Sequence, residues 1–194
     1  MFIGLIKDTG VAAQTEPELI IKVNSIFAAE IEVGSHLAVN GIVLRVSAKD
    51  EANRLTFHKS NLNKSTNYLI RERVNLEPAV RLGEEIPGTF FYGIPTGTVE
   101  LVAKDSLADG GLSIQVSLAD NLTNYLSVKD IACLNGIFMQ IVDLGNRLLS
   151  FNVYPNTLKV TNIGEKQIGD KLNIEFDPIV VKVARIMQKF NLKK

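Results

Sequence analysis

Few side chains in this sequence have the chemistry to move a proton or to attack a carbon atom. The only histidines are His36 and His58, and the only cysteine is Cys133. An imidazole titrates near neutral pH and a thiolate is a strong nucleophile, so these groups are the first candidates for acid–base or covalent catalysis. The two histidines lie in separate segments, where a lone histidine is more often structural than catalytic. Cys133 precedes Asn135 in an apolar stretch, which favours a small buried thiol.

The segments that must position any site occur twice along the chain. Residues 33–46 return as residues 128–141, and the Asn-Gly pairs at Asn40 and Asn135 are 95 positions apart. Residues 74–77 are similar to residues 172–175, and their asparagines, Asn75 and Asn173, are 98 positions apart. This period is too long for a solenoid repeat, so the repetition predicts two domains of one fold.

Alternation of apolar and polar residues dominates both copies. It is typical of half-buried strands in five segments, namely 19–23, 38–46, 112–116, 137–142 and 148–153. Each Asn-Gly pair predicts a tight turn, because both residue types accept positive φ. Many short strands between turns indicate a closed barrel or a sandwich in each half. Short helical turns are expected at 27–31 and at 123–126.

A longer helix is predicted at the C-terminal end of the chain. Asp177 is expected to cap it, and Pro178 suits its first position. Apolar residues recur there at three- and four-residue steps, at Ile179, Val183, Ile186 and Phe190. This stripe needs a covering surface, either its own barrel or copies of the same helix. The pattern breaks at 84–88, which predicts domains at 1–87 and 88–178 followed by the helix at 179–194.

Composition limits the classes of partner. The 194 residues carry 21 basic and 21 acidic side chains, so no net field favours nucleic acid or an anionic membrane. No apolar run reaches the roughly 20 residues of a membrane span, and the first residues lack the basic start of a secretion signal. With one cysteine there is no internal disulfide, so we expect a reducing, cytoplasmic location.

Stretches 1–4, 74–77, 154–164 and 168–178, together with the Asn-Gly strands, carry a resemblance to a known family. In these residues the chain resembles riboflavin synthase alpha chains, a family that includes the lumazine proteins. The resemblance implies an all-β fold of two tandem six-stranded Greek-key β-barrels with a C-terminal helix, commonly assembled as a homotrimer through that helix. In the enzyme, two molecules of 6,7-dimethyl-8-ribityllumazine exchange a four-carbon unit to give riboflavin, without a metal or a cofactor.

The groups that this reaction needs are absent where the resemblance places them. In the family, a histidine–serine–histidine set stands before the second barrel, and cysteine, serine and threonine stand in the Asn-Gly strands. Those positions carry Thr89, Tyr92 and Ile94 in the first case, and Val43, Arg45, Phe138 and Gln140 in the second. Without the proton acceptors and nucleophiles, we predict a catalytically impaired protein. The alternative is a working synthase in which Thr89, Tyr92 or His58 substitutes for the missing groups.

Binding a pteridine requires shape and a few polar groups but no proton shuttle. In the second barrel, Gln140 is expected to bridge the pteridine edge, and Phe138 either walls the ring or fills the pocket. The resemblance places three further residues at ribityl-contacting positions, namely Asn156, Thr157 and Thr161. These residues predict a site for a lumazine or a flavin.

The first barrel departs further from the family pattern. Arg45 suits a ribityl phosphate, as in bound FMN, although an outward strand position also favours a solvated arginine. Ser60, Asn61 and Ser65 replace the usual glutamate and threonines. We therefore expect bound 6,7-dimethyl-8-ribityllumazine, riboflavin or FMN, and a scaffold that binds no ligand is the remaining alternative.

Overall fold

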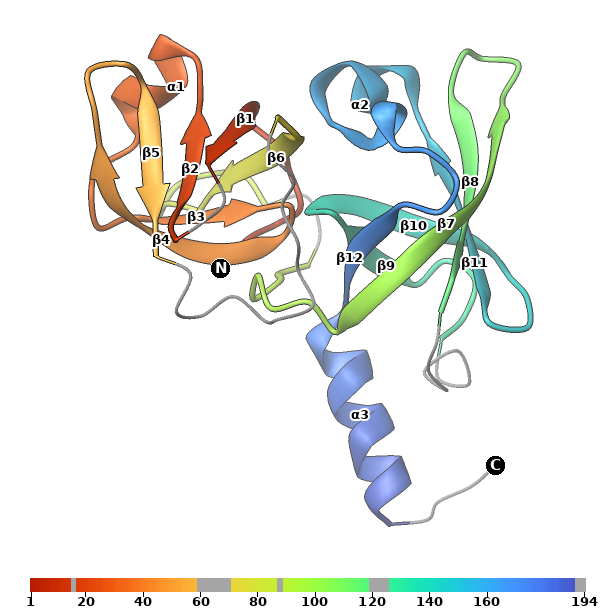
Figure 1. The fold of residues 1–194 in the computed structure, drawn as a ribbon. Coiled ribbons are helices and arrows are strands. Elements are labelled where there is room, and N and C mark those ends of the chain that lie inside the picture. Colours follow the sequence, from red (N-terminus) through yellow and green to blue (C-terminus); the bar gives the residue numbers. More distant parts are fainter. Residues whose placement is uncertain (15–16, 59–70, 87–88, 119–125, 191–194) are drawn as a thin grey trace.

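Two closed β-barrels lie beside each other, and one long helix projects away from them (Figure 1). The computed structural model describes residues 1–14, 17–58, 71–86, 89–118 and 126–190. The helical turn predicted at 123–126 falls almost entirely outside these ranges. None of the helices within them is long and apolar enough to cross a membrane.

The first barrel consists of six antiparallel strands in the spatial order β1-β2-β5-β4-β3-β6. Its strands are β1 (Asp8–Gln14), β2 (Leu19–Lys22), β3 (His36–Val39), β4 (Ile42–Lys49), β5 (Arg54–Phe57) and β6 (Arg73–Pro78). The fourth and third strands follow the fifth in space, which is the Greek-key crossover that the resemblance implied. The predicted strand at 38–46 is a hairpin, because the chain turns at Asn40 and Gly41.

The second barrel repeats this topology in the order β7-β8-β11-β10-β9-β12. Its strands are β7 (Gly97–Ser106), β8 (Leu112–Ser117), β9 (Ile131–Leu134), β10 (Ile137–Leu144), β11 (Leu148–Val153) and β12 (Lys171–Phe176). The duplicated sequence therefore corresponds to a duplicated fold, as predicted.

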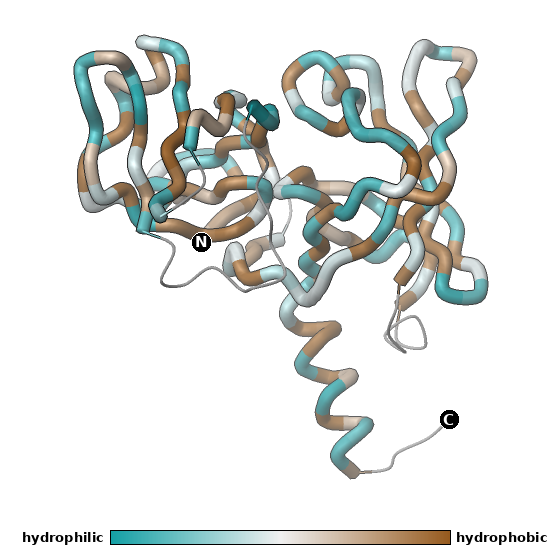
Figure 2. The backbone as a smooth tube through the Cα atoms, viewed as in Figure 1, coloured by the Kyte–Doolittle hydropathy of each residue, from teal (hydrophilic) through white to brown (hydrophobic). Residues whose placement is uncertain are grey.

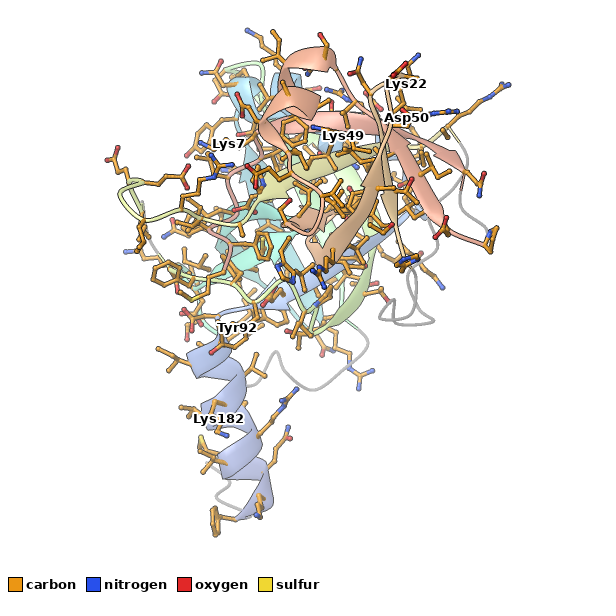
Figure 3. All side chains as sticks on the ribbon, turned by 90° about the vertical axis from the view of Figure 1, so that its left-hand side faces the viewer. Lys7, Lys22, Lys49, Asp50, Tyr92 and Lys182 are labelled. Atoms are coloured by element: carbon orange, nitrogen blue, oxygen red, sulfur yellow. The ribbon has the colours of Figure 1, made fainter. Side chains whose placement is uncertain are left out.

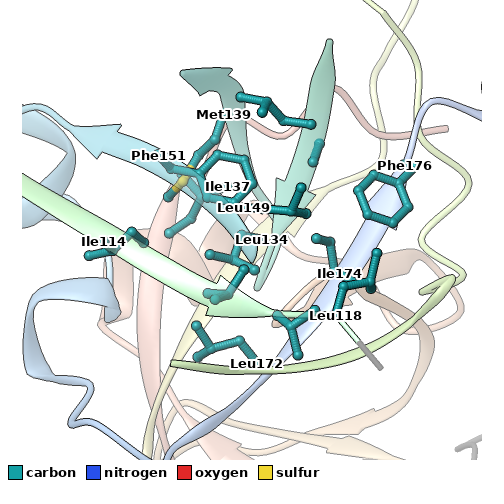
Figure 4. Close-up of a cluster of buried hydrophobic side chains, with 14 of the residues drawn as sticks. Ile114, Leu118, Leu134, Ile137, Met139, Leu149, Phe151, Leu172, Ile174 and Phe176 are labelled. Atoms are coloured by element: carbon teal, nitrogen blue, oxygen red, sulfur yellow. The ribbon is translucent and has the colours of Figure 1, made fainter. Parts of the chain in front are cut away.

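Each barrel encloses its own apolar core, because alternate residues of every strand point inward. Ile137, Met139 and Phe151 belong to the core of the second barrel, and Figure 4 shows them grouped with their neighbours from the other strands. Figure 2 shows the same alternation as apolar and polar patches that follow one another along the strands. The alternation fixes which side chains remain on the outside for a site.

Helices are few and lie at the ends of the barrels. Within the described ranges they are α1 (Ser25–Glu30), α2 (Pro155–Val160), the 3₁₀ turn η3 (Ile163–Glu165) and α3 (Pro178–Lys189). The first confirms the turn predicted at 27–31, whereas α2 was not anticipated from the sequence. Asp177 Oδ1 accepts a hydrogen bond from Ile179 N at 2.8 Å, so the predicted cap of α3 is present.

The apolar stripe of α3 does not pack on its own barrel. Val181 and Ala184 are its buried residues, whereas the side chains of the predicted stripe point away. Ile179 is 73% exposed and Phe190 is 64% exposed. The first of the two predicted coverings is therefore wrong, and the stripe is uncovered in the single chain.

Buried asparagines join the two barrels through reciprocal hydrogen bonds. Asn75 Nδ2 donates to Asn135 O, and Asn173 Nδ2 donates to Asn40 O, both at 2.9 Å. Within each barrel, the turn asparagine in return accepts from the strand, since Asn40 Oδ1 binds Asn75 N and Asn135 Oδ1 binds Asn173 N at 2.8 Å. Buried amides are stabilising only when paired, so these bonds fix how the barrels face each other.

The two Asn-Gly turns meet back to back at this junction. Asn40 and Asn135 both have φ of 47°, and the glycines after them have φ of 77° and 82°. A Cβ atom on Gly41 would lie 2.8 Å from Gly136 N. Glycine is therefore required here both for its backbone conformation and for the close approach of the other barrel.

Candidate functional site

The outer surface of each barrel beside its Asn-Gly turn holds side chains that the sequence singled out. In β4, Val43 and Arg45 lie outside. The residues that alternate with them belong to the first core, namely Ile42, Leu44 and Val46. In β10, Phe138 and Gln140 occupy the same two outward positions. Residues two apart on a strand share a face, so each pair forms part of one continuous surface.

Phe138 does not fill the interior of the second barrel, which was one of its two predicted roles. That position belongs to Met139, which is 5% exposed and lies in the core (Figure 4). Phe138 lies outside, where its ring meets the ring of Phe91 edge-on at a centroid distance of 6.5 Å. Successive side chains of a strand point to opposite faces, so Met139 fills the barrel interior while the neighbouring Phe138 lies on its outer surface.

Each outer surface is bordered by a segment from the other half of the chain. We call residues 2–6 the first lead-in and residues 91–95 the second lead-in. The two lead-ins are joined by an antiparallel backbone bridge between Phe2 and Phe91. Val43 N donates to Gly93 O at 2.8 Å, and Phe138 N donates to Gly4 O at 2.9 Å. The second lead-in therefore borders the surface of β4, and the first lead-in borders the surface of β10.

Two buried glutamates hold the lead-ins, and sequence reasoning assigned neither of them a role. Glu77 Oε1 accepts from Ile3 N at 2.7 Å and from Gly4 N at 3.1 Å. Glu175 accepts in the same way from the second lead-in, from Tyr92 N at 2.7 Å and Gly93 N at 3.0 Å. The repeated segments 74–77 and 172–175 carried the signal, since each places an asparagine and a glutamate on one strand face.

Burial dominates the electrostatics of these two carboxyl groups. It raises the pKa of Glu77 and of Glu175 to about 7, although the backbone N–H donors act in the opposite direction. Glu77 is 2% exposed and Glu175 is 5% exposed. A buried carboxylate costs free energy even when it is hydrogen-bonded, so both groups are poised to titrate near neutral pH.

Arg45 and Gln140 are oriented alike, each by a backbone carbonyl in the turn before the preceding strand. Arg45 Nε donates to Gly34 O at 3.1 Å, and Gln140 Nε2 donates to Lys129 O at 3.3 Å. Both side chains are exposed on the outer surface. The two barrels thus present a polar group at the same place, a cation in the first and a neutral amide in the second.

A cavity of about 370 Å³ opens beside Arg45 on the first barrel. His58 and Ser47 line it together with the arginine. His58 Nδ1 lies 2.8 Å from Glu18 Oε1, which orients the imidazole. Sequence reasoning had set this histidine apart from the binding residues, because strand pairing was needed to bring it to Arg45. Three further predicted residues, Ser60, Asn61 and Ser65, lie outside the described part of the chain.

The polar residues predicted in the second barrel are only partly free to contact a ligand. Asn156 is exposed and Thr157 is half-buried, and both belong to α2. Thr161 is 2% exposed, and its hydroxyl donates to Thr157 O at 2.7 Å. That hydroxyl is bonded to the last turn of α2, and the predicted ribityl contact of Thr161 stays a prediction.

Two of the three residues predicted for an active synthase, Thr89 and Tyr92, lie near the start of α3. Thr89 Oγ1 donates to Asp177 Oδ2 at 2.9 Å, which supports the helix cap. Tyr92 is 57% exposed and borders a cavity of about 630 Å³ between the second lead-in and α3. Figure 3 shows Tyr92 at the upper end of α3, with Lys182 farther along the helix. Neither residue lies on the face of β4 or β10.

The buried thiol of Cys133 does not provide a reactive group on these surfaces. Burial raises the pKa of the Cys133 thiol well above its usual range, and the charges of Glu77 and Glu175 act in the same direction. A thiol that stays protonated is a poor nucleophile. No group of histidine, cysteine, aspartate and glutamate side chains suited to a metal ion occurs among the residues that the structure describes.

Comparison with known sequences gives consistent matches over the whole chain. Residues 95–177 match the family described as the lumazine binding domain. A riboflavin synthase of Chlamydia muridarum is 30% identical over 165 residues, covering 83% of this chain and 80% of that protein. A riboflavin synthase of Brucella abortus is 26% identical over 200 residues, covering 97% of this chain and 98% of that protein.

Solved structures with the same fold include LumP in complex with different ligands. LumP complexed with riboflavin has a TM-score of 0.81 at 20% identity and covers 91% of this chain and 99% of that chain. LumP complexed with 6,7-dimethyl-8-(1'-D-ribityl) lumazine has a TM-score of 0.80 at 20% identity, over 90% of this chain and 98% of that chain. LumP complexed with flavin mononucleotide has a TM-score of 0.75, also at 20% identity, over 91% of this chain and 99% of that chain. At this identity the likeness establishes the fold.

Proposed function

This chain belongs to the riboflavin synthase family, and from that premise we propose that it binds a ribityllumazine or a flavin without converting it. One observation carries the proposal. The outer surfaces of β4 and β10, with their lead-ins, are present in both barrels, but they carry Val43, Arg45, Phe138 and Gln140. Structures of the same fold hold 6,7-dimethyl-8-ribityllumazine, riboflavin and FMN, which supports this ligand class.

The side chains on these surfaces suit a flat heterocycle with polar edges. Val43 and the second lead-in offer an apolar wall on the first barrel, and Arg45 offers donors for ring carbonyls or a phosphate. On the second barrel, Phe138 offers the wall and the amide of Gln140 can both donate and accept. Asn156 and Thr157 remain the proposed ribityl contacts there. No further cofactor is needed for binding alone.

Turnover would need groups that these surfaces do not supply. The reaction removes a proton from a ring methyl group and attacks a ring carbon, which calls for a base near neutral pKa and a nucleophile. The thiol of Cys133 is buried, and the hydroxyl of Thr89 is bonded to Asp177. Glu77 and Glu175 have pKa values of about 7, but both are buried and their carboxyl oxygens accept hydrogen bonds from the lead-ins. The rival proposal, an active synthase that uses Tyr92 or His58, has only the position of His58 beside Arg45 in its favour.

The test is to titrate the purified full-length protein into 6,7-dimethyl-8-ribityllumazine and follow the ligand's fluorescence. We expect saturable binding, and chromatography of the same samples after hours should recover unchanged lumazine. Absence of saturation would contradict the binding proposal. Riboflavin formation above the rate without protein, reduced by Tyr92→Phe or His58→Asn, would support the rival.

We also propose that α3 joins copies of this chain into a homotrimer in the cytoplasm. The uncovered stripe that includes Ile179 and Phe190 supports self-association, because exposed apolar helix faces are stable when paired. Light scattering of the full chain and of a chain ending at Pro178 tests this assembly. If the truncated chain has the same number of copies per assembly as the full chain, this arrangement is contradicted.

A further inference from the structure

The two histidines of this chain flank Arg45 on the outside of the first barrel. His36 in β3 is the direct cross-strand partner of Arg45 in β4. On the other side, Val46 pairs with Phe57, which sets His58 across from Arg45 at the end of β5. Directly paired residues of antiparallel strands share a face, and all three side chains are exposed. We call His36, Arg45 and His58 the basic row.

The second barrel has the same row of positions without a cation. Gln140 takes the place of Arg45, and its cross-strand partner in β9 is Ile131. Ile141 pairs with Phe151, which sets Asn152 across from Gln140 in β11. The backbone geometry is therefore the same in both barrels, and only the side-chain chemistry differs. If the fold alone required basic residues at these positions, they would occur in both barrels.

The contacts of the basic row leave donors available to a ligand. Arg45 uses Nε for Gly34 O, so its two terminal amino groups are not consumed by that bond. Arg45 and His58 both line the cavity of about 370 Å³. Glu18 is the carboxylate that faces this end of the row, and it contacts Nδ1 of His58 rather than the arginine. Among the described residues that line the cavity, Arg45 is thus the permanently charged cation.

We propose that the basic row selects a phosphorylated ligand, so that the first barrel prefers a flavin phosphate over the unphosphorylated flavin. A guanidinium presents two parallel N–H donors that match phosphate oxygens, and the imidazole of His36 has one further N–H donor beside it. Ile131, Gln140 and Asn152, which hold the matching positions, carry no charge, so the second barrel has no such preference. This inference rests on the proposed function, since it assumes that a flavin occupies the surface of β4.

The experiment compares FMN with riboflavin on the full-length protein and uses the second barrel as the template for the variants. Binding is followed by quenching of flavin fluorescence at constant ionic strength. We expect FMN to bind at least about tenfold more tightly than riboflavin, which is the usual scale of a charge-assisted hydrogen bond. Arg45→Gln should abolish this ratio, whatever its effect on the affinity for riboflavin, and circular dichroism shows whether the variant is folded.

Matched variants separate the row from general effects of charge. His36→Ile and His58→Asn, which install the residues of the second barrel, should each reduce the ratio by less than Arg45→Gln. Gln140→Ala should leave the ratio unchanged. Inorganic phosphate should compete with FMN and not with riboflavin.

The outcomes distinguish this inference from the proposal on which it rests. Equal affinity for FMN and riboflavin in the unaltered protein, or a ratio that survives Arg45→Gln, would overturn the phosphate preference while leaving flavin binding intact. Failure of the unaltered protein to bind either flavin or the lumazine would overturn both.

Discussion

In the first barrel Arg45 stands between two histidines, and in the second barrel Gln140 stands between Ile131 and Asn152. The strand order, the Asn-Gly turn and the lead-in contact at these positions are the same in both barrels. The comparison therefore separates residues that build the fold from residues that meet a ligand. Identical residues recur where the barrels hold each other, and different residues occur where each barrel faces outward.

The residues that recur are polar and buried. Asn75 and Asn173 bind the turn of the opposite barrel, and Glu77 and Glu175 bind the lead-ins. A buried polar group without a partner destabilises a fold, so these side chains can change only together with their partners. The outward residues carry no such constraint, which allows the two barrels to differ in ligand chemistry.

The largest expected effect is at the contact between the two turns. Gly41→Ala would place a Cβ atom 2.8 Å from Gly136 N, where neither backbone can move without shifting a barrel. We expect a loss of about 4 kcal/mol in the free energy of unfolding, measured with urea. Gly83→Ala is the control, because φ is also positive there but a Cβ meets nothing within 4 Å. A similar loss in both variants would show that backbone strain, and not the approach of the barrels, makes glycine necessary.

The next effect is the pH dependence that the two glutamates confer. Their pKa is raised to about 7 in the folded protein, so between about pH 4.5 and 7 the folded chain holds protons that the unfolded chain has lost. Stability from this source is complete below pH 4.5 and is lost as the pH rises through 7. The loss is at most about 3 kcal/mol for each group.

Urea unfolding at pH 5 and pH 8 measures this loss, with Glu77→Gln and Glu175→Gln as single and double variants. Each amide should remove about half of the difference in stability between the two pH values, because the two barrels contribute equally. A difference that persists in the double variant would assign it to other groups.

The reciprocal asparagines offer a smaller test that sharpens the comparison. Asn75 and Asn173 both reach across the junction, but Asn75 Oδ1 also accepts from Asn162 N at 2.7 Å. Asn75→Ala should therefore cost about 2 kcal/mol and Asn173→Ala about 1 kcal/mol by chemical denaturation. Equal costs would mean that the contact with Asn162 contributes nothing to stability.

The smallest effect concerns the helix that follows only the second barrel. Asp177→Ala removes the cap of α3 and should cost about 1 kcal/mol. Thr89→Val keeps the cap and removes only the bond from Thr89 to Asp177, so it should cost less. Thermal unfolding of the two variants measures both, and a larger cost for Thr89→Val would show that the cap is not what holds this helix end.

Repetition and alternation in the sequence predicted two domains built from short strands, and the resemblance to a known family was needed to choose Greek-key barrels over sandwiches. The Asn-Gly turns, most strands and the cap at Asp177 followed from local patterns. The helix α2 did not, since Pro155–Val160 contains a β-branched threonine and valine and no capping side chain precedes it. Its pattern is too short to separate a helical turn from a loop.

The candidate site was less accessible from the sequence, because its geometry depends on contacts between distant segments. Which face Phe138 occupies required the strand register, and the link between His36, Arg45 and His58 required three paired strands. The roles of Glu77 and Glu175 required the lead-ins to be in place. The burial of Thr161 and its bond to Thr157 could not be predicted either, because both depend on how α2 folds.

The most direct test of this account is a crystal structure of the full-length protein grown with FMN. The account predicts a flavin on the outer surface of β4, bordered by the second lead-in, with its phosphate against Arg45. A flavin found only on the surface of β10, or one whose phosphate lies away from the basic row, would contradict it.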